Sequence, residues 1–267
     1  MMGRKFGISG SHVIQEDTFS LDQVNELFVD AEIANVQLVT HEENYAKIIL
    51  ETYEKGPDLD VSLENDRLIV FVEDRKRKRF FNFRTSNYCN LYIYIPKGNL
   101  LNYQMLTGAG DVTISNIEGS VLFLKTGAGN VTMETVTMKR IKLSSGAGNV
   151  TLNHVHADHM TFSSGAGRIV GFDCKGKISA ESGAGNINIT IDGEDDVSLS
   201  TGVGNIEVTL PEIETLDATI DISSGIGRVN SDFVSLGGKS TQVFNNGTNR
   251  LTFKTGAGNI YLKGASN

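Results

Sequence analysis

Ser145–Leu152 reads SGAGNVTL, and close variants of this motif recur through the second half of the chain. The first glycines of the copies are Gly108, Gly127, Gly146, Gly165, Gly183, Gly202, Gly225 and Gly256. The steps between them are 19, 19, 19, 18, 19, 23 and 31 residues. A period near 19 residues that holds over six copies indicates one structural repeat.

Apolar residues alternate with polar ones on both sides of the motif. Two positions after the second glycine, the aligned residues are Val112, Val131, Val150, Ile169, Ile187, Ile206, Val229 and Ile260. A second alternating pair follows in each repeat, namely Leu122/Leu124, Ile141/Leu143, Met160/Phe162, Ile178/Ala180 and Val197/Leu199. Side chains of a strand point alternately to its two faces, so this pattern predicts two short strands per repeat, each with one buried face. We therefore expect an all-β fold, a right-handed parallel β-helix or solenoid with coils of about 19 residues.

The repeated motif is expected to form a corner of each coil. Its two glycines permit a positive φ or a close approach of backbones. The residue between them is alanine in six copies, with Val203 and Ile226 in the others, and we expect a small apolar plug there. The position after the second glycine is asparagine at Asn130, Asn149, Asn186, Asn205 and Asn259. Turn asparagines bond to nearby backbone groups, so this column predicts a ladder of amides that stabilises the corners.

The (S/T)GAGN(V/I)xL corner at this step resembles the bacterial "putative adhesin" family of β-strand-repeat domains of unknown function. It is also similar to the related head domains named for a Gly-Ile-Asn motif. The resemblance covers about Leu21 to Leu262 and includes IPKGNLLNYQMLTGAGDV at residues 95–112. It implies a parallel β-helix, often on an envelope or tethered to a membrane, and it supplies no catalytic residues. The chain departs from the family pattern in its long C-terminal steps and in lacking a visible membrane leader.

Three regions follow from the distribution of the repeats. Residues 1–20 are expected to form an N-terminal tail, and residues 21–105 an irregular β region that caps or begins the solenoid. Residues 106–267 hold the regular repeats and a C-terminal cap from longer coils. Within the irregular region, Ala34–Leu38 (ANVQL) resembles a degenerate copy of the later GNVTL sequence.

The long steps near the C-terminus predict an end cap, because a solenoid must cover the apolar core and strand edge of its last coil. The segments expected to fold over the end are Pro211–Ser223 and Asn230–Lys254. Their apolar cover would come from Phe233, Val243, Phe244, Leu251 and Phe253. An incomplete cap would instead pair with a second copy, so a homodimer through the C-terminal coils is the alternative.

The composition is that of a folded β-rich chain, with 29 glycines and only 3 prolines in 267 residues. The net charge of −8 opposes specific binding of nucleic acid. Cys89 and Cys174 are the only cysteines, and their separation fits no metal or redox motif. Cys174 shares a column with Ile117, Val136 and Val155, which predicts an inert buried thiol.

Location is predicted differently by the sequence and by the resemblance. The first 20 residues lack an apolar segment of signal-peptide length, and no stretch approaches the ~20 apolar residues of a membrane-spanning helix. These features favour a cytoplasmic protein, or a chain from which a leader was removed. The family resemblance favours association with the cell surface or envelope.

A run of five cations is the sharpest charged feature of the sequence. It consists of Arg75, Lys76, Arg77, Lys78 and Arg79 and is followed by Phe80, Phe81 and Phe83. Such a run could bind anionic lipid, wall polymer or nucleic acid, so it is a candidate anion-binding tip. The alternative is a solvated hairpin tip whose aromatic rings fold back against the sheet.

Three histidines lie close together at His154, His156 and His159. With Asp158, or with Asp173 one coil later, they are candidate ligands for zinc or nickel. The same column holds Asn116 and Thr135 in other coils, so the pattern does not repeat a site. A solvated face is the default expectation, and we expect no cofactor and no resident metal.

The sequence contains no nucleophile–histidine–carboxylate motif, and its GxG motifs lack the third glycine of a dinucleotide loop. Outward positions, such as Thr113, Thr132 and Thr151, are mostly Thr, Ser, Asn and Lys. The favoured function is a non-catalytic bacterial surface or envelope-associated scaffold, adhesin-like, that binds an unknown protein or glycan. Two alternatives remain, a carbohydrate-active β-helix enzyme and a cytoplasmic accessory protein of envelope stress.

Overall fold

The computed structural model describes residues 2–9, 12–21, 24–73, 89–98, 101–212, 214–233 and 238–265. All regular secondary structure in these residues is β-strand, which confirms the predicted all-β class. No helix in this part of the chain has the length and apolar character needed to cross a membrane. The chain divides into two compact units, Met1–Gly129 and Asn130–Asn267.

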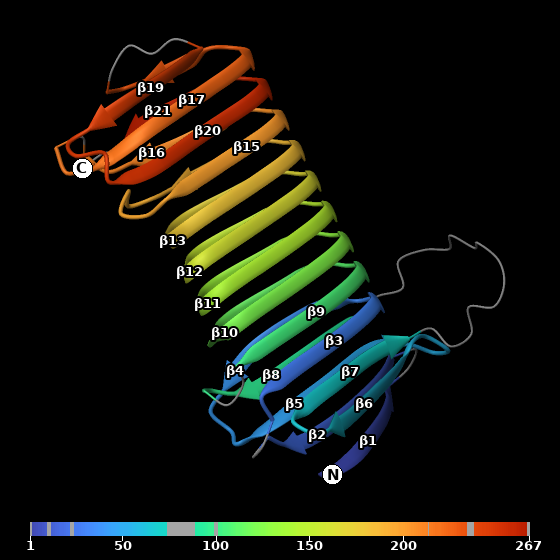
Figure 1. Cartoon of the computed structure of the whole chain (residues 1–267). Helices are drawn as coiled ribbons and strands as arrows, with labels where there is room; N and C mark the ends of the chain where they lie inside the picture. Colours follow the sequence, from blue (N-terminus) through green and yellow to red (C-terminus); the bar gives the residue numbers. More distant parts are fainter. Residues whose placement is uncertain are drawn as a thin grey trace. The chain divides into compact units, whose positions relative to one another are not determined.

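The second unit is built mainly from parallel strands, which Figure 1 shows in yellow-green to red. Its strands are β11 (Val131–Ala147), β12 (Val150–Ala166), β13 (Ile169–Ala184), β14 (Ile187–Thr190), β15 (Val197–Val203), β16 (Ile206–Leu210), β17 (Ala218–Ile226), β18 (Val229–Ser231), β19 (Lys239–Phe244), β20 (Asn249–Ala257) and β21 (Ile260–Gly264). Equivalent residues of successive repeats lie side by side, since Val150 pairs with Val131 on one side and Ile169 on the other. Both pairings are parallel.

The core of this unit is formed by the columns that the sequence pattern predicts. Val131, Val150, Ile169 and Ile206 are fully buried, as are Leu143, Phe162 and Leu199 to within 1%. Each of these side chains therefore packs against its equivalent in the next coil. Cys174 is also buried, as expected, and burial raises the pKa of its thiol to about 12.

Each long strand contains three buried segments, whereas the sequence pattern predicts two. In β12 the buried residues are Val150, Leu152, Val155, Ala157, Met160, Phe162 and Ser164. The alternation shifts phase between Leu152 and Val155, and again between Ala157 and Met160. His154 lies at the first shift and has φ of 53°. Thr135 and Asp173 occupy the equivalent positions with φ of 54° and 50°, so a left-handed residue bends each strand there.

The GAG corner differs from the expected apolar plug, because the residue between the glycines faces outward. Val203 is 61% exposed and Ile226 is 77% exposed. The inward residue is instead the Ser or Thr that precedes the first glycine, as at Ser182 and Thr201. The prediction of an apolar plug was wrong. The alternation of the preceding strand places the Ser or Thr before the first glycine inward, and the next inward residue comes only after the turn.

These buried hydroxyls join one coil to the next. Ser182 donates a hydrogen bond to the carbonyl oxygen of Gly167 at 3.0 Å, and Thr201 donates to that of Gly185 at 2.8 Å. The asparagines act beside them, since Asn149 Oδ1 accepts from the backbone N–H of Arg168 at 3.0 Å. The predicted ladder is therefore present, with amide oxygens bonded to the backbone of the neighbouring coil.

Replacing Gly167 with alanine is expected to destabilise the protein. Gly167 has φ of +156°, and a Cβ there would lie 2.0 Å from the carbonyl oxygen of Gly148. The clash falls on backbone, so the coils would have to separate locally. We expect a loss of about 1–3 kcal/mol of unfolding free energy, measured by urea denaturation. Ala166→Ser is the matched control, because Ala166 is exposed, and an equal loss in both variants would contradict this account of the corner.

The last strands of the unit are not stacked in sequence order. β20 pairs in parallel with β15 on one side and with β17 on the other. Figure 1 shows this order of β15, β20 and β17. β21 likewise lies between β16 and β18. β19 pairs antiparallel with β17. Leu251 and Phe253, predicted as cap residues, are thus fully buried in an inner layer, while Val243 on β19 is 61% exposed.

The first unit combines parallel and antiparallel strands. Its strands are β1 (Met2–Ser9), β2 (His12–Ser20), β3 (Glu26–Ile33), β4 (Asn35–His41), β5 (Tyr45–Tyr53), β6 (Asp58–Glu64), β7 (Arg67–Glu73), β8 (Asn90–Pro96), β9 (Asn102–Ala109) and β10 (Val112–Ala128). β3 lies between β7 and β9, and β4 lies between β8 and β10, all in parallel. β5, β6 and β2 then pair antiparallel with β8, β7 and β5 respectively.

The degenerate repeat in this unit has the register that the sequence predicts. Val36 pairs with Val112 and Leu38 with Ile114. Asn35 Oδ1 accepts a hydrogen bond from the backbone N–H of Asp111 at 3.0 Å, which is the contact made by the asparagines of the regular repeats. The predicted boundaries at residues 20/21 and 105/106 describe repeat content and stay predictions.

Candidate functional site

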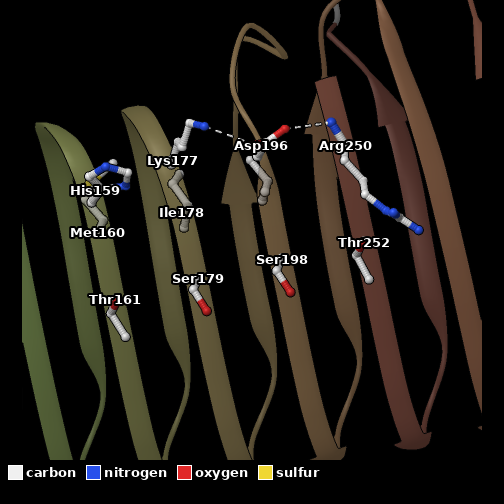
Figure 2. Close-up of a pocket in the computed structure, with 11 residues that line it drawn as sticks. His159, Met160, Thr161, Lys177, Ile178, Ser179, Asp196, Ser198, Arg250 and Thr252 are labelled. Atoms are coloured by element: carbon white, nitrogen blue, oxygen red, sulfur yellow. Dashed lines mark hydrogen bonds and ion pairs between the residues drawn. The ribbon is translucent and has the colours of Figure 1, made fainter. Parts of the chain in front are cut away.

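The candidate site is an exposed face of the second unit, drawn in Figure 2. We use the name polar face for the outward residues that line a depression of about 320 Å³ across β12, β13, β15 and β20. These are His159, Thr161, Lys177, Ser179, Asp196, Ser198, Arg250 and Thr252. They alternate along the strands with inward core residues such as Met160, Ile178 and Leu251. The period of two thus places these polar groups on the outer side of the strands.

A row of hydroxyl groups crosses the polar face. Thr161 pairs with Ser179, Ser179 with Ser198, and Ser198 with Thr252. Because neighbouring strands are ~4.8 Å apart, the four hydroxyls recur at that interval. Each can donate one hydrogen bond and accept two, so the row can bind a partner that carries hydroxyl groups of its own.

A charged row lies next to the hydroxyl row. Lys177 Nζ is 3.2 Å from Asp196 Oδ2, and the backbone N–H of Arg250 donates to Asp196 Oδ1 at 2.9 Å. The dashed lines of Figure 2 mark both contacts. The Arg250 hydrogen bond, followed by that of Lys177, lowers the pKa of Asp196. The carboxylate therefore stays ionised at neutral pH and holds the two neighbouring strands in register.

The predicted histidine cluster lies mostly at the strand bend. His154 Nε2 and His156 Nε2 are 3.8 and 3.5 Å from Asp173 Oδ2, and Lys175 Nζ is 3.7 Å from Asp173 Oδ1. The sequence thus correctly places Asp173 beside His154. His159 lies on the following segment and lines the polar face with Lys177.

The contacts of Asp173 are ion pairs within the part of the chain that the structure describes. No group of three His, Cys, Asp or Glu side chains there has the arrangement needed to hold an ion. His154 also has a structural role, because histidine is one of the residues that tolerate the left-handed backbone of the bend. Asp173 is surrounded by three basic side chains, and ion pairing accounts for the cluster when the imidazoles are protonated.

The other predicted site residues are placed as follows. The basic run Arg75–Arg79 lies outside the described residues. Asp158 is exposed beside His159 at the second bend of β12. Cys89 and Cys174 are free thiols, both buried, and burial raises the pKa of Cys89 to about 11.

Apart from His159, the residues of the polar face were missed by the sequence analysis, which considered outward hydroxyls only near the motif, at Thr113, Thr132 and Thr151. The signal that could have found them is the residue between each second apolar pair. Ser179, between Ile178 and Ala180, and Ser198, between Val197 and Leu199, are outward for the same reason as Thr151.

A comparison with known protein families agrees with the repeat and with the stacking of the strands. The family described as Toastrack DUF4097, a domain of unknown function, matches residues 24–263. The chain belongs to this family. No curated protein matches the Toastrack chain.

Several solved structures are similar to this chain at low sequence identity. A "putative adhesin" from Bacteroides fragilis is 18% identical, with a TM-score of 0.57 and coverage of 96% of this chain and 100% of that one. A "putative lipid binding protein" from Parabacteroides distasonis is 13% identical, with a TM-score of 0.47 and coverage of 94% and 97%. A "putative adhesin" from Parabacteroides merdae is also 13% identical, with a TM-score of 0.35 and coverage of 95% and 96%. The Bacteroides fragilis structure supports the fold of the Toastrack chain and does not identify a ligand.

Proposed function

We propose that this Toastrack chain is a non-catalytic binding scaffold of the bacterial surface or envelope, and that its polar face contacts a glycan. The observation that carries the proposal is the hydroxyl row from Thr161 to Thr252, which continues over four strands. Rigid stacked strands hold these groups in place before binding, so little conformational entropy is lost when a partner docks. The adhesin description of the Bacteroides fragilis structure supports the same class of role.

The chemistry of the carboxylates on and beside this face favours binding over catalysis. A general acid of a glycan-cleaving enzyme must keep its proton near neutral pH, which requires a raised pKa. Asp196 has a lowered pKa, and so does Asp221 on β17, through hydrogen bonds from Thr241 and Arg250. Both groups accept hydrogen bonds from fixed donors, as structural carboxylates do.

The location at the bacterial surface or envelope is part of this proposal. Fractionation of the cells that produce the protein, with the chain followed by immunoblot, checks the location.

We also propose that the coils are right-handed and about 19 residues long, because crossovers between parallel strands prefer that hand. A crystal structure with left-handed coils would contradict this part.

The glycan proposal is tested by binding to a panel of bacterial wall polysaccharides, with dextran as a simple neutral glycan. We expect Ser179→Ala with Ser198→Ala to weaken binding at least about fivefold, since each lost hydrogen bond contributes about 1 kcal/mol. The matched control is Thr132→Ala with Thr151→Ala, which removes two hydroxyls outside the polar face. Equal effects of the two pairs, or release of new reducing ends from a glycan, would overturn the proposal.

A further inference from the structure

Next to the polar face, the strands β20, β17 and β19 form three rows of outward residues. The row on β20 consists of Arg250, Thr252 and Lys254. The row on β17 consists of Asp221 and Ser223. On β19, Thr241 lies beside Asp221 and Lys239 beside Ser223. These residues line a second depression, of about 760 Å³, which shares Ser198, Arg250 and Thr252 with the polar face.

Within this depression the negative charge is already neutralised. Arg250 donates from Nε and Nη2 to Asp221 Oδ2 at 2.9 and 2.6 Å. Thr241 Oγ1 donates to Asp221 Oδ1 at 2.7 Å, so both carboxylate oxygens have partners. Lys254 acts on Asp221 only through its charge, as the weakest of the causes that lower the pKa of this carboxyl.

The two lysines are left as the charged groups available to a ligand. Ser223 pairs with Lys254 on one side and with Lys239 on the other, which puts the two lysine backbones about 10 Å apart, or two strand spacings. Both residues are exposed, and neither has an ion pair within the described ranges of the chain. With Arg250 and Asp221, the depression carries two more positive than negative charges, in a chain whose net charge is −8.

We propose that Lys239 and Lys254 bind a carboxylate or phosphate group of an acidic glycan whose hydroxyls contact Ser223, Thr252 and the polar face. This inference rests on the proposed function and adds the charge class of the ligand. The flexible ammonium groups of the two lysines, on either side of Ser223, can converge on one anion. The flanking hydroxyls can form hydrogen bonds with the hydroxyls of the sugar. The continuity of the two depressions lets one chain contact both.

A nucleic acid fits this surface less well than an acidic glycan. Proteins that bind single strands place aromatic rings against the bases, and no Phe, Tyr or Trp is among the described residues that line either depression. Local positive charge beside hydroxyl groups is the combination that an acidic sugar chain complements.

The test measures binding of a polyuronate, a phosphomannan, neutral dextran and single-stranded DNA by calorimetry, using the full chain. We expect the polyuronate or the phosphomannan to bind more tightly than dextran, and the two results separate carboxylate from phosphate recognition. Lys239→Gln with Lys254→Gln should weaken acidic-glycan binding at least about tenfold. Binding by the unaltered chain should weaken as ionic strength rises from about 0.05 to about 0.15 M.

Two control variants accompany the test. Lys125→Gln with Lys139→Gln removes the same charge from exposed positions outside the depression and should change binding less than about twofold. Lys239→Arg with Lys254→Arg keeps the charge and should retain binding. Thermal melting followed by circular dichroism verifies that all variants fold, which is expected because these side chains are exposed.

The outcomes separate this inference from the proposed function. Equal binding of dextran and the acidic glycans, lost with the Ser179 and Ser198 substitutions, would overturn the anion site and leave the glycan scaffold standing. Equal loss in the two glutamine variants would overturn the anion site as well. Tighter binding of DNA than of any glycan, removed by the Lys239 and Lys254 substitutions, would overturn both glycan assignments.

Discussion

Val150→Asp is expected to abolish the cooperative melt of the second unit or to lower its unfolding free energy by at least about 4 kcal/mol. Val150 is fully buried between Val131 and Ile169. The substitution would place a carboxylate in a stack of apolar side chains, where no described neighbour in the column can donate a hydrogen bond. The measurement is urea denaturation followed by circular dichroism.

Thr151→Asp is the matched control for this substitution. Thr151 is the next residue of the same strand, and it points outward between Thr132 and Val170. An aspartate there remains hydrated, so we expect a change within about 1 kcal/mol. Unfolding by Thr151→Asp with retention of the fold in Val150→Asp would reverse the assignment of inner and outer faces.

The sequence predicts this part of the fold well because the same alternation of apolar and polar residues recurs in each repeat and indicates the same buried positions each time. A period of two identifies the inner face, and the alignment of Val131, Val150 and Ile169 at equal steps identifies the parallel register. The same reasoning places Val36 beside Val112, although Ala34–Leu38 lacks the glycines of the motif. Register is encoded locally, so even a degenerate copy retains it.

The order of the coils could not be predicted in this way. Leu251 and Phe253 have the same alternation as Val197 and Leu199, and any coil with this pattern can pair with any other. No local feature of the sequence indicates that β20 lies between β15 and β17 rather than after β17. The second depression depends on that order, because it brings Lys254 to the strand beside Ser223 and Lys239.

Deleting residues 249–267 is expected to disrupt the C-terminal part of the second unit instead of trimming its end. The deletion removes β20 and β21, which pair with β15 and β16 on one side and with β17 and β18 on the other. Their inward residues Leu251, Phe253, Ile260 and Leu262 are at most 2% exposed. Burial of four large side chains contributes on the order of 10 kcal/mol, which is comparable to the whole stability of a domain.

The remaining strands would lose their partners on both sides of the gap. Thr255 donates to the carbonyl oxygen of Gly204, and Ser224 donates to that of Gly258, so the deleted layer also links the corners before and after it. We expect the shortened chain to show lower strand content and aggregation by light scattering. A soluble, monomeric chain with unchanged stability would mean that these strands form a dispensable outer end.

Two phenylalanines test the same order with single substitutions. The sequence assigns Phe253 and Phe244 alike to an end cap, whereas the structure places Phe253 fully buried in β20 and Phe244 half-buried on β19. Phe253→Ala should lower the unfolding free energy by about 3–5 kcal/mol, because it leaves a cavity between two coils. Phe244→Ala should cost about 1 kcal/mol or less, since its ring is partly hydrated already. Urea denaturation of the two variants measures both losses of unfolding free energy. If β20 were an outer strand at the end of the stack, the two losses would be similar.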